Sequence, residues 1–339
     1  MTGNTHLYQR SPMPVNYVRN LVELLAASGL DSERLLAEAG LSREQVFGAE
    51  AQLRFAQFRA IMLAGRKLSG DDAIGLRLGQ KLMLTAHGLL GYAVISSANL
   101  GEAMALLQRY FCTRTRLCAP SFERDAKGGV LRFHEMMELG DIRQTYLEVM
   151  VAAVVSAMRF ILGDTVSRCR LSLPYVRPTY GDSYTRLLGL PVSFEGTVLT
   201  LAVPQDLLDA PFPMADTASR QQAAEKCEEE LQRLEADQDM EARVRQQLMQ
   251  AEVALPSVEE LARRFHMTSR TLRRRLEAAK TSYQGILDDV RRLRALRYLA
   301  ANQSVQQVAW LLGYADPSNF SRAFRKWTGQ SPSAFLAQG

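Results

Sequence analysis

Hydrophobic residues recur at helical spacing through the first third of the chain. The pattern is clear in VRNLVELLAASGL, LRFAQFRAIMLAGRKL and LGEAMALLQRYF, and Gly29, Gly70 and Gly101 stand near the breaks between such segments. We therefore expect residues of about 14–113 to form a series of helices.

The pattern changes between Leu117 and Pro204. SFERD and VLRFHEM flank Lys127-Gly128-Gly129, which is typical of a β-hairpin, and CRLSLPYV and VSFEGTVLTLAV predict further strands. Between them, 141–162 predicts a long helix. Its apolar run is interrupted by Ser156 and Arg159, so we expect a buried helix and no membrane span. Residues 14–210 are thus predicted to be one α+β domain, with a helical lead and a small sheet.

A charged segment follows the turn-forming residues PFPMAD at 211–216. Residues 219–250 are rich in Glu, Gln, Arg and Ala, contain no Gly or Pro, and predict a helix with a thin apolar stripe of Cys227, Leu231 and Leu234. Two interpretations are open: a linker solvated on all sides, or a helix that buries this stripe against a second copy. We expect 211–255 to be a charged helical linker.

The last part of the chain contains an internal repeat. SVEELARRF at 257–265 corresponds to SVQQVAWLL at 304–312, and RTLRRRLE at 270–277 corresponds to NFSRAFR about 48 positions later. Each copy predicts a helix capped by a serine, a tight turn, and a second helix beginning at Ser269 or at Asp316, with Pro317 in the first turn. The pattern predicts two helix-turn-helix units in an all-α domain over 256–337, and we expect Trp310 to lie beside the contact between the helices of the second unit.

The second helix of each unit is the one expected to enter a major groove of DNA. The leucines and phenylalanines of these helices are expected to face inward, which leaves polar residues on the solvent-facing side. These are predicted to read bases: Arg270, Arg273, Arg274, Ser318, Asn319 and Arg322. Others are predicted to contact phosphates: Arg275, Lys280, Ser321, Arg325 and Lys326.

Length and charge agree with a DNA partner. Residues 282–301 predict a connecting helix of about 30 Å at 1.5 Å per residue, close to the roughly 34 Å between successive major-groove faces. Residues 250–339 contain 14 Lys/Arg and 7 Asp/Glu, whereas the rest of the chain has 27 and 29. The basic excess is therefore confined to the segment with the repeat, as expected for contact with a polyanion.

Other functional classes lack the residues they need. The four cysteines and four histidines are scattered, so we expect reduced thiols, no metal site and no cofactor. No GxSxG, P-loop, GxGxxG or HExxH motif is present, so an enzyme is not expected. The first residues do not form a secretory signal, and a cytoplasmic protein without a membrane partner is predicted.

At its C-terminal repeat the chain resembles the AraC/XylS family of bacterial transcription regulators. The resemblance is carried by SVEELARRF with MTSRTLRRRL, at 257–276, and by VAWLLGYADPSNFSRAFRKWTGQSP, at 308–332; His266 stands where the family usually has glycine. GLLGYAVISSANLGEAM at 88–104 is similar to the sensor domain of one subgroup, and the length and layout are similar to those of regulators of ornithine utilisation. The resemblance implies a ligand-responsive regulator of promoter DNA, usually an activator that recruits RNA polymerase.

The resemblance also suggests what the N-terminal domain binds. Ornithine or a related basic amino acid would need a cation for its carboxylate and acids for its ammonium groups, and the candidates are Arg114, Arg116 and Glu148. The aromatic residues Tyr92, Tyr110, Phe111 and Tyr146 are expected in the core instead. Three alternatives remain open: a domain that only forms a homodimer and binds no effector, a repressor, and a catalytic N-terminal domain.

Overall fold

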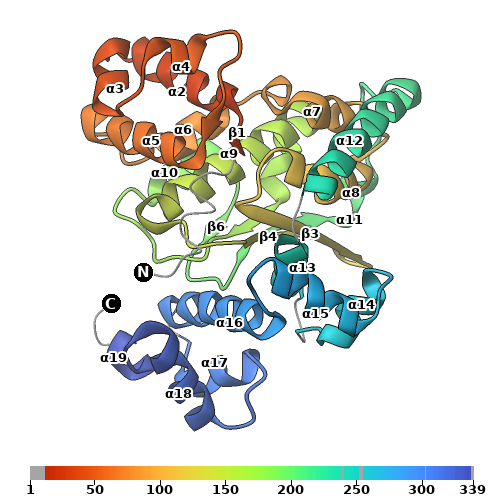
Figure 1. Ribbon diagram of the computed structural model, residues 1–339. Coiled ribbons are helices and arrows are strands. Elements are labelled where there is room, and N and C mark those ends of the chain that lie inside the picture. The colour runs from red at the N-terminus through yellow and green to blue at the C-terminus, as the bar shows by residue number, and fades with distance from the viewer. Residues whose placement is uncertain (1–11, 238–239, 252–254, 302, 337–339) are drawn as a thin grey trace.

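The computed structural model describes residues 12–237, 240–251, 255–301 and 303–336. Figure 1 shows a helical layer at the N-terminal end, a sheet beneath it, and the C-terminal helices on the other side of the sheet. The helical lead and the α+β domain predicted from the sequence are confirmed.

The N-terminal helices and short strands are β1 (Pro12–Met13), α2 (Val15–Ala27), α3 (Ser32–Glu38), α4 (Arg43–Phe47), β2 (Leu53–Arg54), α5 (Phe55–Ser69), α6 (Ile74–Lys81), η1 (Leu84–His87), α7 (Gly88–Ile95), α8 (Leu100–Tyr110) and η2 (Phe111–Thr113).

The centre of this domain is α9 (Arg143–Leu162), which follows the short η3 (Gly140–Ile142) and packs closely along α6. Two glycines of α6 make the close approach possible. A β-carbon at Gly79 would lie 2.4 Å from the carbonyl oxygen of Val149, and one at Gly75 would lie 2.6 Å from Oε2 of Glu148. Backbone and side chains of α9 therefore occupy the space that larger residues on α6 would need.

The sheet has five strands in the order β3-β4-β7-β5-β6. β3 (Cys118–Asp125) and β4 (Gly128–Glu135) form the predicted hairpin, and β4 pairs antiparallel with β7 (Leu199–Pro204). β5 (Arg170–Ser172) is antiparallel to β7 and parallel to β6 (Val192–Ser193). The connections are η4 (Gly163–Arg168), α10 (Asp182–Leu188) and α11 (Gln205–Asp209).

One segment of the described residues, Gly140–Arg168, is long and apolar enough to cross a membrane. It contains α9, whose side chains Leu147, Val149, Val151 and Val155 are almost wholly buried inside the domain. α9 is therefore a core helix of this domain.

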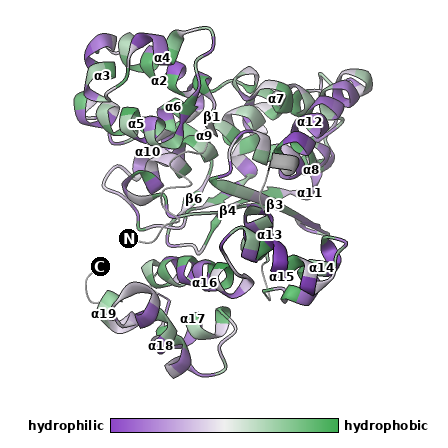
Figure 2. Cartoon of the chain, in the orientation of Figure 1, coloured by the Kyte–Doolittle hydropathy of each residue, from purple (hydrophilic) through white to green (hydrophobic). Residues whose placement is uncertain are grey.

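The charged segment after the N-terminal domain forms α12 (Thr217–Asp237). Cys227 is fully buried against Leu90 of α7 and Tyr110 of α8, and Leu231 packs at the same place. The apolar stripe is thus covered by the chain's own N-terminal domain, which differs from both the solvated linker and the dimer contact that we considered. The helix lies along α7 and α8 in Figure 1, and Figure 2 shows that much of it is hydrophilic.

A second helix, α13 (Met240–Gln250), lies in the segment expected to be linker. Val244, Leu248 and Met249 are buried in one core with Leu261, Leu272, Leu276 and Ile286 of the first helix-turn-helix unit. The helix is therefore an integral part of that unit, although its polar composition suggested an exposed helix.

The C-terminal helices follow the predicted repeat. The first unit contains α14 (Val258–Arg264) and α15 (Ser269–Ala278), the connecting helix is α16 (Tyr283–Ala300), and the second unit contains α17 (Val305–Leu311), α18 (Pro317–Thr328) and α19 (Pro332–Leu336). Ser257 and Ser304 each form a complete capping box, with Glu260 and Gln307. Asp316 caps α18 as predicted, whereas α15 is capped by Thr268, one residue before the predicted Ser269.

The C-terminal helices rest on the sheet of the N-terminal domain. Ala119 of β3 and Met136, just after β4, belong to the core that contains α13. On α16, Arg292 pairs with Glu138, and Arg297 donates to the carbonyl of Glu135 and lies 3.8 Å from its carboxylate. α16, the helix that connects the two helix-turn-helix units, is thereby joined to the N-terminal domain.

Candidate DNA-reading helices and ligand cavity

In the first unit, α15 presents one arginine-rich face to solvent. Leu272 and Leu276 are fully buried, and this turns Arg270, Arg273 and Arg274 outward, where all three are exposed. Arg273 pairs with Glu259 of α14 at 3.2 Å, and the two side chains are both 59% exposed. An ion pair this exposed contributes little stability, so the guanidinium can exchange its partner for a base or a phosphate.

In the second unit, α18 buries Phe320 and Phe324 and exposes Ser318, Asn319 and Arg322. Nη2 of Arg322 donates to Oδ1 of Asn319 at 2.6 Å. The two side chains therefore lie next to each other on the outer face of α18. Pro317 and the Asp316 cap fix where this face begins.

The predicted phosphate-contacting residues lie around these two faces. Arg275, Lys280, Arg325 and Lys326 are exposed, and Ser321 is half-buried. Lys280 has a φ of 58° and ends the turn after α15, with its N–H donating to the carbonyl of Glu277. The structure places all five on or beside α15 and α18.

The prediction for Trp310 was wrong. The side chain is 75% exposed on α17, and the contact between α17 and α18 is made by the buried Val308 and Ala309 with Phe320. In this helix the tryptophan lies one position beyond the buried alanine, which turns it to solvent.

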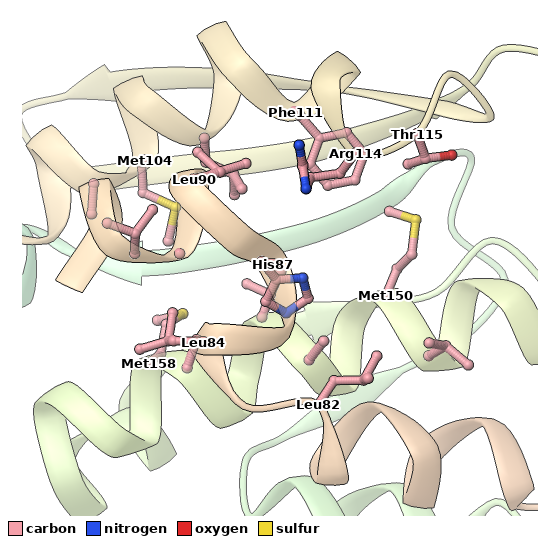
Figure 3. A pocket seen from close by; sticks show the side chains of 18 of the residues that line it. Leu82, Leu84, His87, Leu90, Met104, Phe111, Arg114, Thr115, Met150 and Met158 are labelled. Atoms are coloured by element: carbon pink, nitrogen blue, oxygen red, sulfur yellow. The ribbon is translucent and has the colours of Figure 1, made fainter. Parts of the chain in front are cut away.

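The N-terminal domain contains a cavity between α7, α8 and α9 (Figure 3). Its walls are mainly aliphatic, aromatic and thioether side chains, among them Leu84, Leu90, Met104, Phe111, Met150 and Met158. Phe111 and Tyr146, expected to be core aromatics only, both line it, and the expectation for Tyr92 was wrong, since its side chain is 56% exposed on α7. The motif at 88–104 supplies one wall, and Gly91 permits it, since a β-carbon there would lie 1.9 Å from the carbonyl oxygen of Leu84.

One side of the cavity carries polar groups. The guanidinium of Arg114 and the ring of His87 both extend into it in Figure 3, and Thr115, Tyr17 and Tyr146 add hydroxyls. Nδ1 of His87 lies 2.8 Å from the Tyr17 hydroxyl. Burial, followed by the charge of Arg114, lowers the pKa of His87 to about 4, so this imidazole is neutral near pH 7. Arg114 is therefore the single charged group among the described lining residues.

The three residues considered for an amino-acid effector are not brought together. Arg114 lines the cavity, whereas Arg116 lies outside the lining and donates to the carbonyl of Leu234 in α12 at 3.4 Å. Glu148 lies on another face of α9, fully buried, and accepts from Gln144 at 3.2 Å, from Tyr180 at 2.8 Å and from Tyr184. Burial raises the pKa of Glu148 to about 6.

Two family models match the chain. Residues 29–212 match the arabinose-binding domain of AraC transcription regulators, and residues 261–338 match a helix-turn-helix domain. Together they cover most of the N-terminal domain and of its cavity lining, and both α15 and α18.

Named relatives agree with these matches. The chain is 35% identical to the ornithine utilization regulator of Pseudomonas aeruginosa, over 95% of this chain and 96% of the relative. It is 27% identical to the HTH-type transcriptional regulator VqsM of the same species, over 80% and 86% of the two chains. Among solved structures, the transcriptional regulator CdpR from Pseudomonas aeruginosa aligns at 26% identity and a TM-score of 0.46, over 90% of this chain and 96% of that one. The chain has the arabinose-binding type of N-terminal domain, a C-terminal helix-turn-helix domain, and polar faces exposed on α15 and α18. It therefore belongs to the AraC family and is a DNA-binding transcriptional regulator.

Proposed function

We propose that this regulator reads promoter DNA with α15 and α18 in successive major grooves and responds to a small molecule held in the N-terminal cavity. The observation that carries the DNA part is the pair of outward faces, Arg270, Arg273 and Arg274 on α15 and Ser318, Asn319 and Arg322 on α18. Arginine pairs with guanine and asparagine with adenine in the major groove, so both faces have the chemistry of base readout. The phosphate contacts are assigned to Arg275, Lys280, Ser321, Arg325 and Lys326.

The connecting helix supports simultaneous reading. α16 has 18 residues and a length of about 27 Å at 1.5 Å per residue. Ile286, Val290, Ala295 and Leu299 are buried along it, the first two in the core of the first unit and the last two in that of the second. A rigid rod shared by two cores favours a fixed separation of the reading helices.

The cavity favours effector sensing over a domain that only dimerises. A domain used for dimerisation alone has no need of an internal cavity with an arginine at one side, whereas ligand sites are typically apolar with a few polar groups. The apolar stripe of α12 is already covered by α7 and α8, so a homodimer would use another surface. Activation through RNA polymerase is supported by family membership.

The name of the P. aeruginosa relative raises ornithine, or a related amino acid, as the effector. Ornithine carries two ammonium groups, which a binding site must match with acids or several carbonyls. The described residues that line the cavity include no carboxylate, and Glu148 lies elsewhere on α9. The regulated genes can be those of amino-acid catabolism without ornithine itself being the molecule in this cavity.

The test of the DNA part is selection of bound sequences from a random duplex library by the full-length protein, followed by footprinting. We expect a recognition element made of two blocks on one face of the duplex, about 10 base pairs apart from centre to centre. A single block, or protection that does not depend on sequence, would contradict readout by both helices.

A further inference from the structure

We propose that the cavity binds an apolar monocarboxylic acid, whose carboxylate competes with Glu230 of α12 for the guanidinium of Arg114. The inference rests on the proposed sensing function and names the chemistry of the effector. It also identifies the contact through which occupancy of the cavity reaches the helix that leads to the DNA-binding units.

The walls of the cavity indicate the main body of the ligand. Leucines, valines, methionines and alanines from α7, α8 and α9 surround the space, and Arg114, His87, Thr115, Tyr17 and Tyr146 supply the polar atoms. Apolar surface transferred from water into such a space provides most of the binding free energy. A sugar or a diamine would leave hydroxyls or ammonium groups without partners against these walls.

Arg114 indicates the charge of the ligand. Its side chain is only 18% exposed, and Nη1 approaches the start of α7, where a β-carbon at Gly88 would lie 3.0 Å from it. Among the described lining residues it faces no acid, and His87 beside it is neutral near pH 7. A single positive charge at one side of an apolar space matches a single carboxylate on an apolar chain.

The guanidinium already holds an anion that comes from the linker helix. Nη2 of Arg114 donates to Oε1 and Oε2 of Glu230 at 2.7 and 2.9 Å. The Glu230 side chain is 36% exposed, so it can return to water when another carboxylate takes its place. Binding of the ligand anion therefore removes one of the polar contacts that hold α12 on the N-terminal domain.

The remaining contacts of α12 show what such an exchange would loosen. Cys227 and Leu231 pack against α7 and α8, and Glu228 accepts from Arg109 at 2.8 and 3.0 Å outside the cavity. Leu90 of α7 both lines the cavity and touches this part of α12. Occupancy of the cavity can thus act on α12 through Arg114 and through α7. The Glu228–Arg109 pair is a comparable contact of α12 outside the cavity, and it serves as the control for the Glu230–Arg114 pair.

The experiment is calorimetric titration of the full-length protein with sodium butyrate, octanoate and dodecanoate, each below its micelle concentration, and with 1-octanol and L-ornithine. We expect saturable binding of octanoate or dodecanoate, weaker binding of butyrate and none of ornithine. Arg114→Gln should lower octanoate affinity at least about tenfold, which corresponds to loss of a charge-assisted contact, and should leave 1-octanol binding nearly unchanged. Ala157→Phe, which adds bulk to the α9 wall of the cavity, should weaken both ligands.

Glu230→Gln and Glu228→Gln separate the exchange from a general loosening of α12. The first should raise octanoate affinity about three- to tenfold because it removes the competing anion, and the second should leave it unchanged. In hydrogen exchange, octanoate should increase exchange of α12 amides in the parent and have less effect in Glu230→Gln.

Four outcomes would overturn the inference. Binding of ornithine in preference to every carboxylate would contradict the ligand class and would leave sensing intact. Equal binding of octanoate and 1-octanol would contradict the role of Arg114, and an unchanged affinity in Glu230→Gln would contradict the exchange. Failure of all ligands, with selective DNA binding retained, would reject the inference and leave the DNA-reading function standing.

Discussion

Arg114 and Glu230 are 116 positions apart in the chain, and they meet where the N-terminal cavity adjoins the linker helix, with Nη2 of the arginine donating to both carboxylate oxygens. One partner belongs to the cavity wall and the other to α12, so the pair connects the two parts whose coupling defines a ligand-responsive regulator.

Base-reading and phosphate-contacting residues should respond differently to substitution. Arg274→Ala and Arg322→Ala should each cost about 1–3 kcal/mol of discrimination at one or two base pairs, since each removes a major-groove contact. Arg325→Ala should weaken binding to all sequences equally and reduce the slope of log K against log salt by about 1. Competition binding with base-scanned duplexes at several salt concentrations measures both. Equal losses on every sequence for Arg274→Ala would contradict its assignment.

His266 should be a site of backbone strain. It occupies the turn between α14 and α15 with a φ of 54°, whereas the corresponding turn of the second unit has Gly313 at 78°. A side chain in the left-handed region costs about 1 kcal/mol relative to glycine. His266→Gly should therefore slow hydrogen exchange in α14 and α15 by a factor that corresponds to this free energy. Gly313→Ala is the reverse control and should speed exchange in α17 and α18.

Glu148 should make the N-terminal domain less stable as the pH rises. Its pKa in the folded protein is about 6, above the ordinary value of 4.5, so the stability it contributes is present below about pH 4.5 and is lost on passing through pH 6. A shift of this size corresponds to about 2 kcal/mol. Glu148→Gln should thus raise the free energy of unfolding relative to the parent at pH 7.5, and the gain should vanish near pH 4.

Denaturant unfolding at several pH values, followed by circular dichroism, measures this difference. Glu225→Gln, on the exposed side of α12, is the control and should leave stability within about 0.5 kcal/mol of the parent. A gain for Glu148→Gln that is the same at pH 4 and pH 7.5 would show that burial of the charge is not its cause.

Trp310 should be dispensable for folding. With three quarters of its side chain in solvent, Trp310→Asp should change stability by less than about 0.5 kcal/mol. Phe324→Ala, at a fully buried position of the same unit, should cost about 3–5 kcal/mol. Tryptophan fluorescence follows unfolding of this unit: Trp327 is the one tryptophan left in Trp310→Asp, whereas Phe324→Ala keeps both Trp310 and Trp327. Loss of the folded signal in Trp310→Asp would contradict the exposure of this side chain.

The contact between α16 and the sheet should depend on charge. Glu138→Lys replaces the partner of Arg292 with a like charge and should weaken the docking of the C-terminal helices on β3 and β4. Small-angle scattering should then show a larger radius of gyration, and Glu123→Lys, on the exposed part of β3, should not increase it. Identical scattering of both variants would show that docking does not need this pair.

Local signals made the C-terminal domain predictable. Ser257, Ser304 and Asp316 cap helices through bonds that span two or three residues, and the buried leucines and phenylalanines of α15 and α18 follow the 3.6-residue period. The cap at Thr268 was missed by one residue because Ser269 has equivalent chemistry. α13 lies within the helix predicted over 219–250, but its packing against the first unit was not predicted. Its apolar residues are few, although Val244 and Leu248 stand four residues apart on one face.

The cavity depended on tertiary contacts that local patterns do not contain. Tyr17, His87, Arg114 and Met150 come from four separate segments, which tertiary packing brings together around the cavity. The motif at 88–104 was the one signal in the sequence for this region, because it indicated a family whose N-terminal domain binds ligands. It did not indicate which side chains face inward, so Arg116 and Glu148 were grouped with Arg114 from proximity and charge alone.

The joint between α16 and the sheet has a mechanical consequence. Arg292, near the middle of α16, and Arg297, near its C-terminal end, join this helix to the sheet side of the N-terminal domain, and a proposed reading helix lies beyond each end. A tilt of α16 at this joint would therefore move both proposed reading helices at once. Such a tilt would change the phase of the two proposed reading helices relative to the turn of the duplex and would leave the fold of each unit unaltered. A small movement at this joint would therefore misalign both helices with their major grooves at the same time.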